Sequence, residues 1–285
     1  MGKYMKILVA VDGSEFSKSA FRQACRLARE NGRTLTAVMA VPALEDQFEV
    51  LKHREKAEAV LKELSEKVMA SIKAIGDEEG VKTAVNIVDG DAHSAISEAA
   101  AEGRHDLVVM GRRGKTGIER ALMGSVTARV IGHSSADVLV VQKNTALGWK
   151  KILVATDGSR HGDAAVDKAI DLAKAYGGEL AVVSVVDVNE EIYAEAPEAV
   201  EGFVKTSLKA VAAVKEKAEK AGLKVESVVK EGEAYQAIVD AAKELNANLV
   251  VMGSHGRTGL KRLLMGSVTE KVIGHIPCPV LVVKS

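Results

Sequence analysis

Hydrophobic and polar residues follow two alternating patterns along this chain. Short, mostly β-branched apolar runs are each followed by a turn and then by a longer segment in which apolar residues recur at helical spacing. The first such unit is the run 6–11, the turn Asp12-Gly13-Ser14 and a segment from Phe16 to Asn31 that stops at Gly32. The same reading predicts strands near 6–11, 34–41, 82–88, 107–110 and 138–142, and helices near 16–31, 46–75, 91–102 and 125–132.

The second half of the chain repeats this series of elements. KILVAVDGS at 6–14 returns as KILVATDGS at 151–159, and segments 107–133 and 249–275 are identical at 19 of 27 aligned positions. Such a duplication predicts two domains, residues 1–146 and 147–285, divided near the polar segment NTALG. The strands of the second copy are expected near 151–156, 179–186, 224–230, 248–252 and 280–283.

Strands that alternate with helices favour a parallel sheet covered on both faces through right-handed crossovers. We therefore expect an α/β chain of two tandem doubly wound domains, each with five strands in the order 3-2-1-4-5. In that order strands one and four are neighbours, and ligands bind beside their carboxyl ends, where the winding reverses. Asp12 and the loop after residue 110 would then flank one crevice, and Asp157 and the loop after residue 252 would flank another.

A glycine-rich loop follows the fourth strand in both copies, with the spacing G-x2-G-x9-G-S. Its glycines allow positive φ and the close approach of a ligand. Neither a P-loop nor a dinucleotide fingerprint is present, so backbone amides rather than a lysine would hold an anion. A plain strand-to-helix turn is the alternative for one copy, but retention of the pattern in both favours anion binding. The predicted donors are Gly111, Gly114, Gly124, Ser125 and Val126, and in the second copy Gly253, Gly256, Gly266, Ser267 and Val268.

Composition narrows the class of protein. The 39 basic and 39 acidic residues cancel, which argues against nucleic acid as a partner. No apolar run has membrane-spanning length and no signal peptide is recognised, so we expect a cytoplasmic protein with no membrane contact. Cys25 and Cys278 occupy different places in the two copies and are expected to be buried apolar residues. His133 and His275 are expected to cap the ends of their helices.

The glycine pattern and the opening Asp-Gly-Ser turn resemble the universal stress protein family, in its UspA-like, ATP-binding branch with an adenine nucleotide α-hydrolase-like fold. The resemblance covers nearly the whole chain and implies one ATP site per copy, with Mg²⁺ as an accompanying ion. Asp12 and Asp157 would contact the base and ribose, and the backbone of Ala40 and Val185 would meet adenine. The implied sites are Ala10, Val11, Asp12, Ala40, Met110, Gly111, Arg113, Gly114, Gly124, Ser125, Val126 and Thr127, and Ala155, Thr156, Asp157, Val185, Met252, Gly253, His255, Gly256, Gly266, Ser267, Val268 and Thr269.

The two copies differ in ways that bear on these sites. The first loop has Arg112-Arg113 where the second has Ser254-His255, the commoner form in the family. Two interpretations of the arginines remain: side chains directed to solvent, or side chains that grip a γ-phosphate. Pro42 stands where the second copy has Asp187, next to the expected adenine edge.

Three functions are compatible with these residues. The favoured one is a regulator of the stress response whose contact with an unknown protein partner depends on bound ATP. The alternatives are a slow ATPase or phosphotransferase, for which no catalytic residue is predicted, and a nucleotide-independent scaffold. Because runs 138–141 and 280–283 are apolar strands at predicted sheet edges, we also expect them to pair in an intramolecular pseudo-dimer, which could form a further homodimer through another face.

Overall fold

The computed structural model describes residues 4–42, 54–114, 123–188, 193, 195–256 and 265–285. Residues 46–53 of the predicted second helix and Gly117 of the first glycine loop lie outside this part of the chain. The main division between two compact units falls between Lys143 and Asn144, so each unit contains nearly all of one copy of the duplication.

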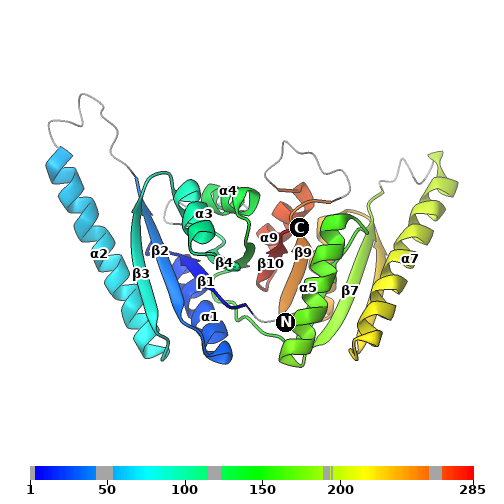
Figure 1. The fold of residues 1–285 in the computed structure, drawn as a ribbon. Coiled ribbons are helices and arrows are strands. Elements are labelled where there is room, and N and C mark those ends of the chain that lie inside the picture. The colour runs from blue at the N-terminus through cyan, green and yellow to red at the C-terminus, as the bar shows by residue number, and fades with distance from the viewer. Residues whose placement is uncertain (1–3, 43–53, 115–122, 189–192, 194, 257–264) are drawn as a thin grey trace. The chain divides into compact units, whose positions relative to one another are not determined.

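The N-terminal unit is a parallel sheet in the strand order β3-β2-β1-β4-β5. Helices α1 and α2 pack together, as do α3 and α4, and the two pairs cover the sheet (Figure 1). Its elements are β1 (Ile7–Ala10), α1 (Glu15–Asn31), β2 (Leu35–Val41), α2 (Arg54–Glu78), β3 (Thr83–Asp89), α3 (Ala92–Glu102), β4 (Leu107–Gly111), α4 (Ser125–His133) and β5 (Asp137–Val141).

The C-terminal unit repeats this topology, with parallel strands in the order β8-β7-β6-β9-β10. The α/β fold, the five-stranded sheets and the 3-2-1-4-5 order predicted for both copies are therefore confirmed. Its elements are β6 (Lys151–Ala155), α5 (Arg160–Tyr176), β7 (Glu179–Val186), α7 (Pro197–Lys220), β8 (Val225–Glu231), α8 (Ala234–Glu244), β9 (Leu249–Gly253), α9 (Ser267–His275) and β10 (Val280–Val283).

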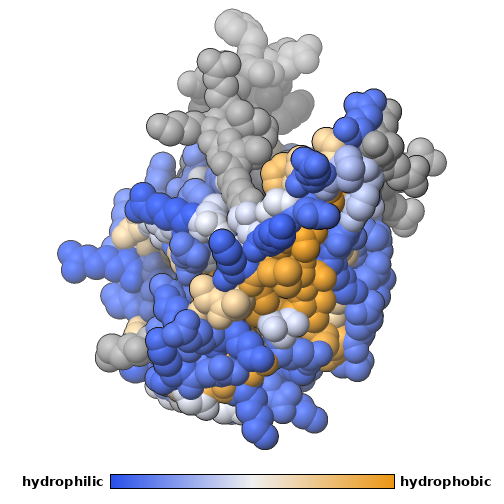
Figure 2. All heavy atoms as spheres, turned by 90° about the vertical axis from the view of Figure 1, so that its right-hand side faces the viewer, coloured by the Kyte–Doolittle hydropathy of each residue, from blue (hydrophilic) through white to orange (hydrophobic). Residues whose placement is uncertain are grey.

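The burial of the central strands explains why apolar runs in the sequence predicted them correctly. Every residue of β1, β4 and β9 is buried, because helices cover both faces of these central strands. The outer strands β3 and β8 carry polar residues, and none of their residues is buried. Figure 2 looks at the C-terminal unit from the side of α7, where hydrophilic residues frame an apolar area. The exposed large apolar side chains of this unit are Tyr193, Phe203 and Leu208.

The beginning of the C-terminal unit is fixed by an aromatic stack. The indole of Trp149 lies flat on the ring of Tyr176, with centroids 4.0 Å apart and planes 6° apart. Tyr176 is the last residue of α5, and Gly177 ends that helix in the left-handed conformation. A Cβ on the next residue, Gly178, would overlap the backbone carbonyl oxygen of Trp149. The first copy has Arg33 at the equivalent place, so this glycine is required by the Trp149 segment.

Several predicted structural roles are confirmed. Cys25 and Cys278 are buried free thiols, and burial raises the pKa of both to about 12. His133 and His275 each place Nδ1 2.8 Å from a carbonyl oxygen of the preceding helical turn, as expected of residues that cap a helix end. Within the described residues, no helix is long and apolar enough to span a membrane. The same residues contain no group of three or more metal-ligating side chains suited to a metal ion.

Candidate functional site

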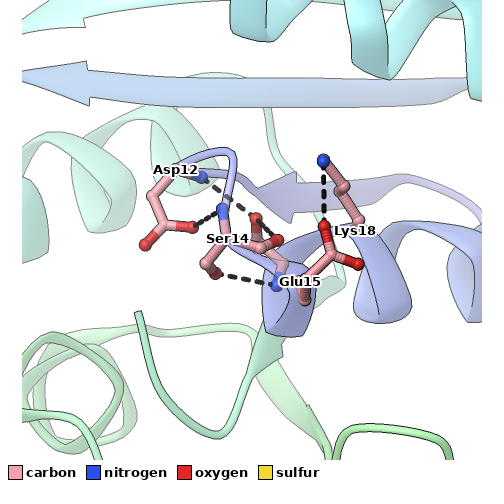
Figure 3. Close-up of polar contacts among 5 residues, drawn as sticks. Asp12, Ser14, Glu15 and Lys18 are labelled. Carbon is pink, nitrogen blue, oxygen red and sulfur yellow. Dashed lines mark hydrogen bonds and ion pairs between the residues drawn. The ribbon is translucent and has the colours of Figure 1, made fainter. Parts of the chain in front are cut away.

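A tight turn follows the first strand in each unit and fixes a carboxylate at the carboxyl edge of the sheet. Oδ1 of Asp12 accepts a hydrogen bond from the amide of Ser14 at 2.9 Å (Figure 3). Oδ1 of Asp157 accepts the same bond from Ser159, also at 2.9 Å. Ser14 and Ser159, not the aspartates, are the N-caps of α1 and α5. The aspartates therefore hold the turn and leave the capping of the helix to serine.

The glycine loop lies directly against this carboxylate. A Cβ on Gly114 would be 2.6 Å from Oδ2 of Asp12, and a Cβ on Gly256 would be 2.9 Å from Oδ2 of Asp157. These separations are shorter than van der Waals contact, so only glycine fits at either position without displacing the carboxylate. The aspartate after strand one and the loop after strand four therefore meet in both units, as expected, with one oxygen of the aspartate facing the loop.

The expectation of positive φ in this loop is wrong for the described glycines. Gly111, Gly114, Gly253 and Gly256 do not adopt the left-handed conformation. These positions require glycine because neighbouring atoms approach them too closely for a side chain. A Cβ on Gly111 would be 2.8 Å from the backbone of Phe16, and one on Gly253 would be 2.7 Å from the carbonyl oxygen of His161. β4 ends at Gly111 and β9 ends at Gly253, and the first turn of α1 or α5 packs against this last strand residue.

The expected amide donors also need correction. The amide of Gly124 donates to the carbonyl oxygen of Arg112 at 2.9 Å, and that of Gly266 donates to Ser254 at 2.8 Å. These two amides close the base of the loop and are not available to a ligand. The first hydrogen bond within α4 is donated by Ala128 to Gly124, so the amides that precede it belong to the helix N-terminus. The helix ladder leaves the amides of Ser125, Val126 and Thr127, and of Ser267, Val268 and Thr269, without an intrahelical partner, and donation by Gly114 and Gly256 stays a prediction.

Two threonines tie the helix to the strand beneath it. Thr127 donates its hydroxyl to the carbonyl oxygen of Gly111, and Thr269 donates its hydroxyl to Gly253, both at 3.1 Å. Their side chains are 3% and 4% exposed. Since each hydroxyl proton is already donated within the protein, a ligand at this position would be met by the amides of these residues.

The crevice of the C-terminal unit opens into a cavity of about 540 Å³, within the range usual for small-molecule sites. All twelve residues predicted for the second site line it. They are Ala155, Thr156, Asp157, Val185, Met252, Gly253, His255, Gly256, Gly266, Ser267, Val268 and Thr269.

Nine further residues line the cavity, and of these only Asp187 was singled out in the sequence, as a neighbour of the expected adenine edge. Phe203 and Ser207 come from α7, and their spacing of four along a helix was the one available signal that they share a face. The others lie on α5, on β7 and the residue after it, and on α8. The nine residues are Gly162, Val183, Ser184, Val186, Asp187, Phe203, Ser207, Ala234 and Ile238.

The backbone predicted to meet adenine points to the crevice. The amide of Val11 donates to the carbonyl oxygen of Val38 at 2.9 Å, and that of Thr156 donates to Val183 at 3.0 Å. Backbone groups of residues two apart in a strand point to the same side. Ala40 and Val185 therefore turn their N–H and C=O groups toward the space beyond the ends of β1 and β6.

The structure also brings together predicted residues of the first site. Beside Asp12 and Gly114, an added Cβ on Gly124 would lie 3.5 Å from Cα of Arg113. Arg112 and Arg113 are half-buried, so neither is fully exposed to solvent, and a grip on a γ-phosphate stays a prediction. Burial, together with the neighbouring charge of Arg113, lowers the pKa of Arg112. The first loop therefore carries two neighbouring positive charges, those of Arg112 and Arg113.

The second loop carries His255 in place of Arg113, and this imidazole lies near His161 of α5. The rings of His161 and His255 are tilted against each other with centroids 5.5 Å apart. Nδ1 of His161 lies 2.6 Å from the hydroxyl of Ser285, and Nδ1 of His255 lies 3.1 Å from that of Ser254. Burial lowers the pKa of His161, as do the charges of His255, Arg160 and Lys284, while Asp157 acts in the opposite direction.

This lowered pKa predicts a loss of stability in acid. Between the folded pKa and the usual value of about 6.5, the unfolded chain binds more protons at His161 than the folded chain does, so stability falls as the pH decreases through that window. His161→Phe, which installs the residue found at position 16, should remove this part of the pH dependence. The measurement is the urea midpoint of both proteins from pH 7.5 to 5. Equal slopes in the two proteins would contradict the prediction.

Together these features define a class: a pair of doubly wound α/β domains with a carboxylate, a glycine loop and a helix N-terminus at the switch point of each sheet. The model of the universal stress protein family matches residues 3–142 and 148–284. The chain therefore belongs to the universal stress protein family and contains two of its domains.

Individual relatives agree with this assignment. "Universal stress protein MJ0531" of Methanocaldococcus jannaschii is 40% identical over 140 residues, which cover 48% of this chain and 82% of that protein. A universal stress protein of Mycolicibacterium smegmatis is 28% identical over 98% of this chain and 96% of its own length. A solved universal stress protein of Archaeoglobus fulgidus, 24% identical, covers 98% of this chain and 96% of that one with a TM-score of 0.68. That structure shares the fold.

Proposed function

We propose that each domain binds one molecule of ATP, and that the chain acts as a nucleotide-dependent regulator in a stress response rather than as an enzyme. The observation that carries the proposal is the cavity of the C-terminal unit. The twelve residues that the family resemblance implies for the second site all line this one cavity. The N-terminal unit repeats the contact of aspartate, glycine loop and helix N-terminus.

The polar groups of the site are arranged so that the phosphates, the ribose and the adenine of one ATP molecule would each meet a suitable partner. Free amides at the start of α4 or α9 would face the phosphates, where the helix dipole favours negative charge. Asp12 or Asp157, with one carboxylate oxygen toward the crevice, would accept from ribose hydroxyls. The backbone of Ala40 or Val185 would offer one donor and one acceptor to the adenine edge. Mg²⁺ would be carried by the phosphates, with the aspartate as a nearby oxygen ligand.

The regulatory reading is preferred over catalysis because the described residues near each loop offer a single carboxylate. Hydrolysis of ATP or phosphoryl transfer needs a positioned metal ion together with a base or an acceptor aligned with the γ-phosphate. In the C-terminal cavity Asp187 also lines the wall, but it follows β7, whereas the glycine loop follows β9 and lies against Asp157. A nucleotide-independent scaffold would need neither the amides at the start of α4 and α9 nor glycines packed against the aspartates, yet both copies have them.

Titration calorimetry with ATP tests the proposal directly. We expect close to two molecules bound per chain, and release of adenine nucleotide when the purified protein is boiled. Turnover of labelled ATP should stay below one per binding site over the time of the titration. A chain that binds no nucleotide would support the scaffold function, and sustained multiple turnover would support the ATPase.

The remaining parts of the proposal concern the whole chain. We retain the boundary 1–146 and 147–285, a cytoplasmic location and a protein partner whose contact depends on ATP. Pairing of β5 with β10 in an intramolecular pseudo-dimer also stays a prediction. Residues 1–146 expressed alone should self-associate through the uncovered edge of β5, and sedimentation that shows a stable monomer at high concentration would contradict it.

A further inference from the structure

Ser184 stands out in the wall of the C-terminal cavity. It lies in β7, its side chain is 1% exposed, and it lines the cavity. Its Oγ has no hydrogen-bond partner among the described residues. Burial of a hydroxyl without a partner is unfavourable, so a group of this kind in the wall of a cavity is typical of a contact that a ligand or a water molecule completes.

Strand geometry places this hydroxyl on one side of the sheet. Ser184 pairs with Val229 of β8, and paired residues of parallel strands point to the same face. Val229 packs with Val186 against Val200 at the start of α7. The side chain of Ser184 therefore points to the α7 face, from which Phe203 and Ser207 also line the cavity.

The position of β7 separates Ser184 from the phosphate end of the proposed site. The glycine loop and the N-terminus of α9 follow β9, and β6 lies between β9 and β7 in the sheet. The neighbouring residue Val185 offers the backbone edge proposed for adenine. A ligand group that reaches Ser184 is thus part of the base, and the aromatic ring of Phe203 on the same side agrees with a flat, partly apolar ligand.

The first copy lacks this hydroxyl. Met39 occupies the equivalent position of β2, one residue before Ala40 as Ser184 is one residue before Val185. The thioether of methionine neither donates a hydrogen bond nor accepts one strongly. The nearest counterpart of Ser207 in the first copy is Ser65, whose hydroxyl donates to the carbonyl oxygen of Lys62 at 2.8 Å and is satisfied within its own helix.

We propose that Ser184 hydrogen-bonds the base of a purine nucleotide in the second site and makes that site more selective for the base than the first. The inference rests on the proposed function, since it assigns a specificity residue to the same cavity. The ligand is a purine with a polar atom, the 6-amino group or N7, directed toward α7. The first site, with Met39 in place of the hydroxyl, accepts purines that lack that atom with little loss.

The test is Ser184→Ala in a chain whose first site is disabled by Gly114→Val. We expect ATP to bind the second site about tenfold more weakly, the equivalent of one hydrogen bond. We also expect the urea midpoint of the ligand-free protein to stay unchanged or to rise, because an unpartnered hydroxyl has been removed. Ser65→Ala is the matched control: it removes a buried, satisfied serine hydroxyl and should lower stability without any effect on the second site.

Analogues identify the atom concerned. Purine riboside triphosphate lacks the 6-amino group and 7-deaza-ATP lacks N7. One of the two should bind the wild-type second site more weakly than ATP but bind the Ser184→Ala variant as well as ATP does. ATP affinity unaffected by Ser184→Ala, or a loss of stability equal to that of Ser65→Ala, would overturn the inference and leave the proposed function intact. Absence of ATP binding at both sites of the unmodified chain would instead overturn the proposed function.

Discussion

Gly256→Val should abolish ATP binding at the second site and leave the first site intact, and Gly114→Val should do the reverse. A Cβ at either position would press on Oδ2 of the adjacent aspartate at 2.6 to 2.9 Å, and the turn at Ser14 or Ser159 holds that carboxylate in place. The side chain would also fill the space proposed for phosphate. We expect at least about 100-fold weaker binding, comparable with the loss of two hydrogen bonds to buried groups.

Calorimetry should therefore give one ATP per chain for each variant and none for the double variant. Gly266→Ala is the control from the same loop, because its added methyl group would meet neighbouring atoms at an ordinary 3.5 Å. It should keep the second site within about tenfold of the wild type. Two sites of undiminished affinity in Gly256→Val would show that ATP does not lie against this loop.

Gly178→Ala should destabilise the C-terminal unit by more than about 3 kcal/mol, the upper range for overpacking against atoms that cannot move aside. The clash is with the backbone carbonyl of Trp149, whose indole is held by the stack on Tyr176, so no side-chain rotation relieves it. Trp149 is the single tryptophan of the chain, and its fluorescence reports urea unfolding of this unit.

The neighbouring Gly177 provides the control for this prediction. Its φ is +68° and nothing lies within 4 Å of an added Cβ, so Gly177→Ala should cost only the strain of a left-handed residue, about 1 to 2 kcal/mol. A urea midpoint for Gly178→Ala as high as that of Gly177→Ala would show that the Trp149 segment yields, and that the stack does not fix it.

The sequence was sufficient for the fold because local pattern and tertiary environment agree in the central strands. Strands such as β4 and β9 are buried on both faces, so their continuous apolar runs are also their structural signal. The two halves of each site could be predicted for the same reason. Parallel strands one and four end at the same edge, so Asp157 and Gly256 had to meet once the strand order was known.

Features that depend on how the chain folds back on itself could not be predicted from the sequence. The amide of Gly124 looked available to an anion, but the loop folds back and that amide donates to Arg112. Gly111 looked like a residue of positive φ, although packing of Phe16 is what excludes a side chain. Phe203 and Ser184 reach the cavity from α7 and β7, outside the turn and the glycine loop that carry the sequence pattern.

The closed base of the glycine loop has a consequence for protein engineering. Backbone bonds join Gly124 to Arg112 and Gly266 to Ser254, and the threonine hydroxyls bind the strand ends, so both ends of each loop are anchored independently of the residues between them. Each doubling of the length of a flexible loop costs only about 0.6 kcal/mol of closure entropy. A circularly permuted fluorescent domain inserted after residue 118 or 260 would therefore leave the anchors in place, and the chain could serve as a scaffold for two genetically encoded sensors of different selectivity.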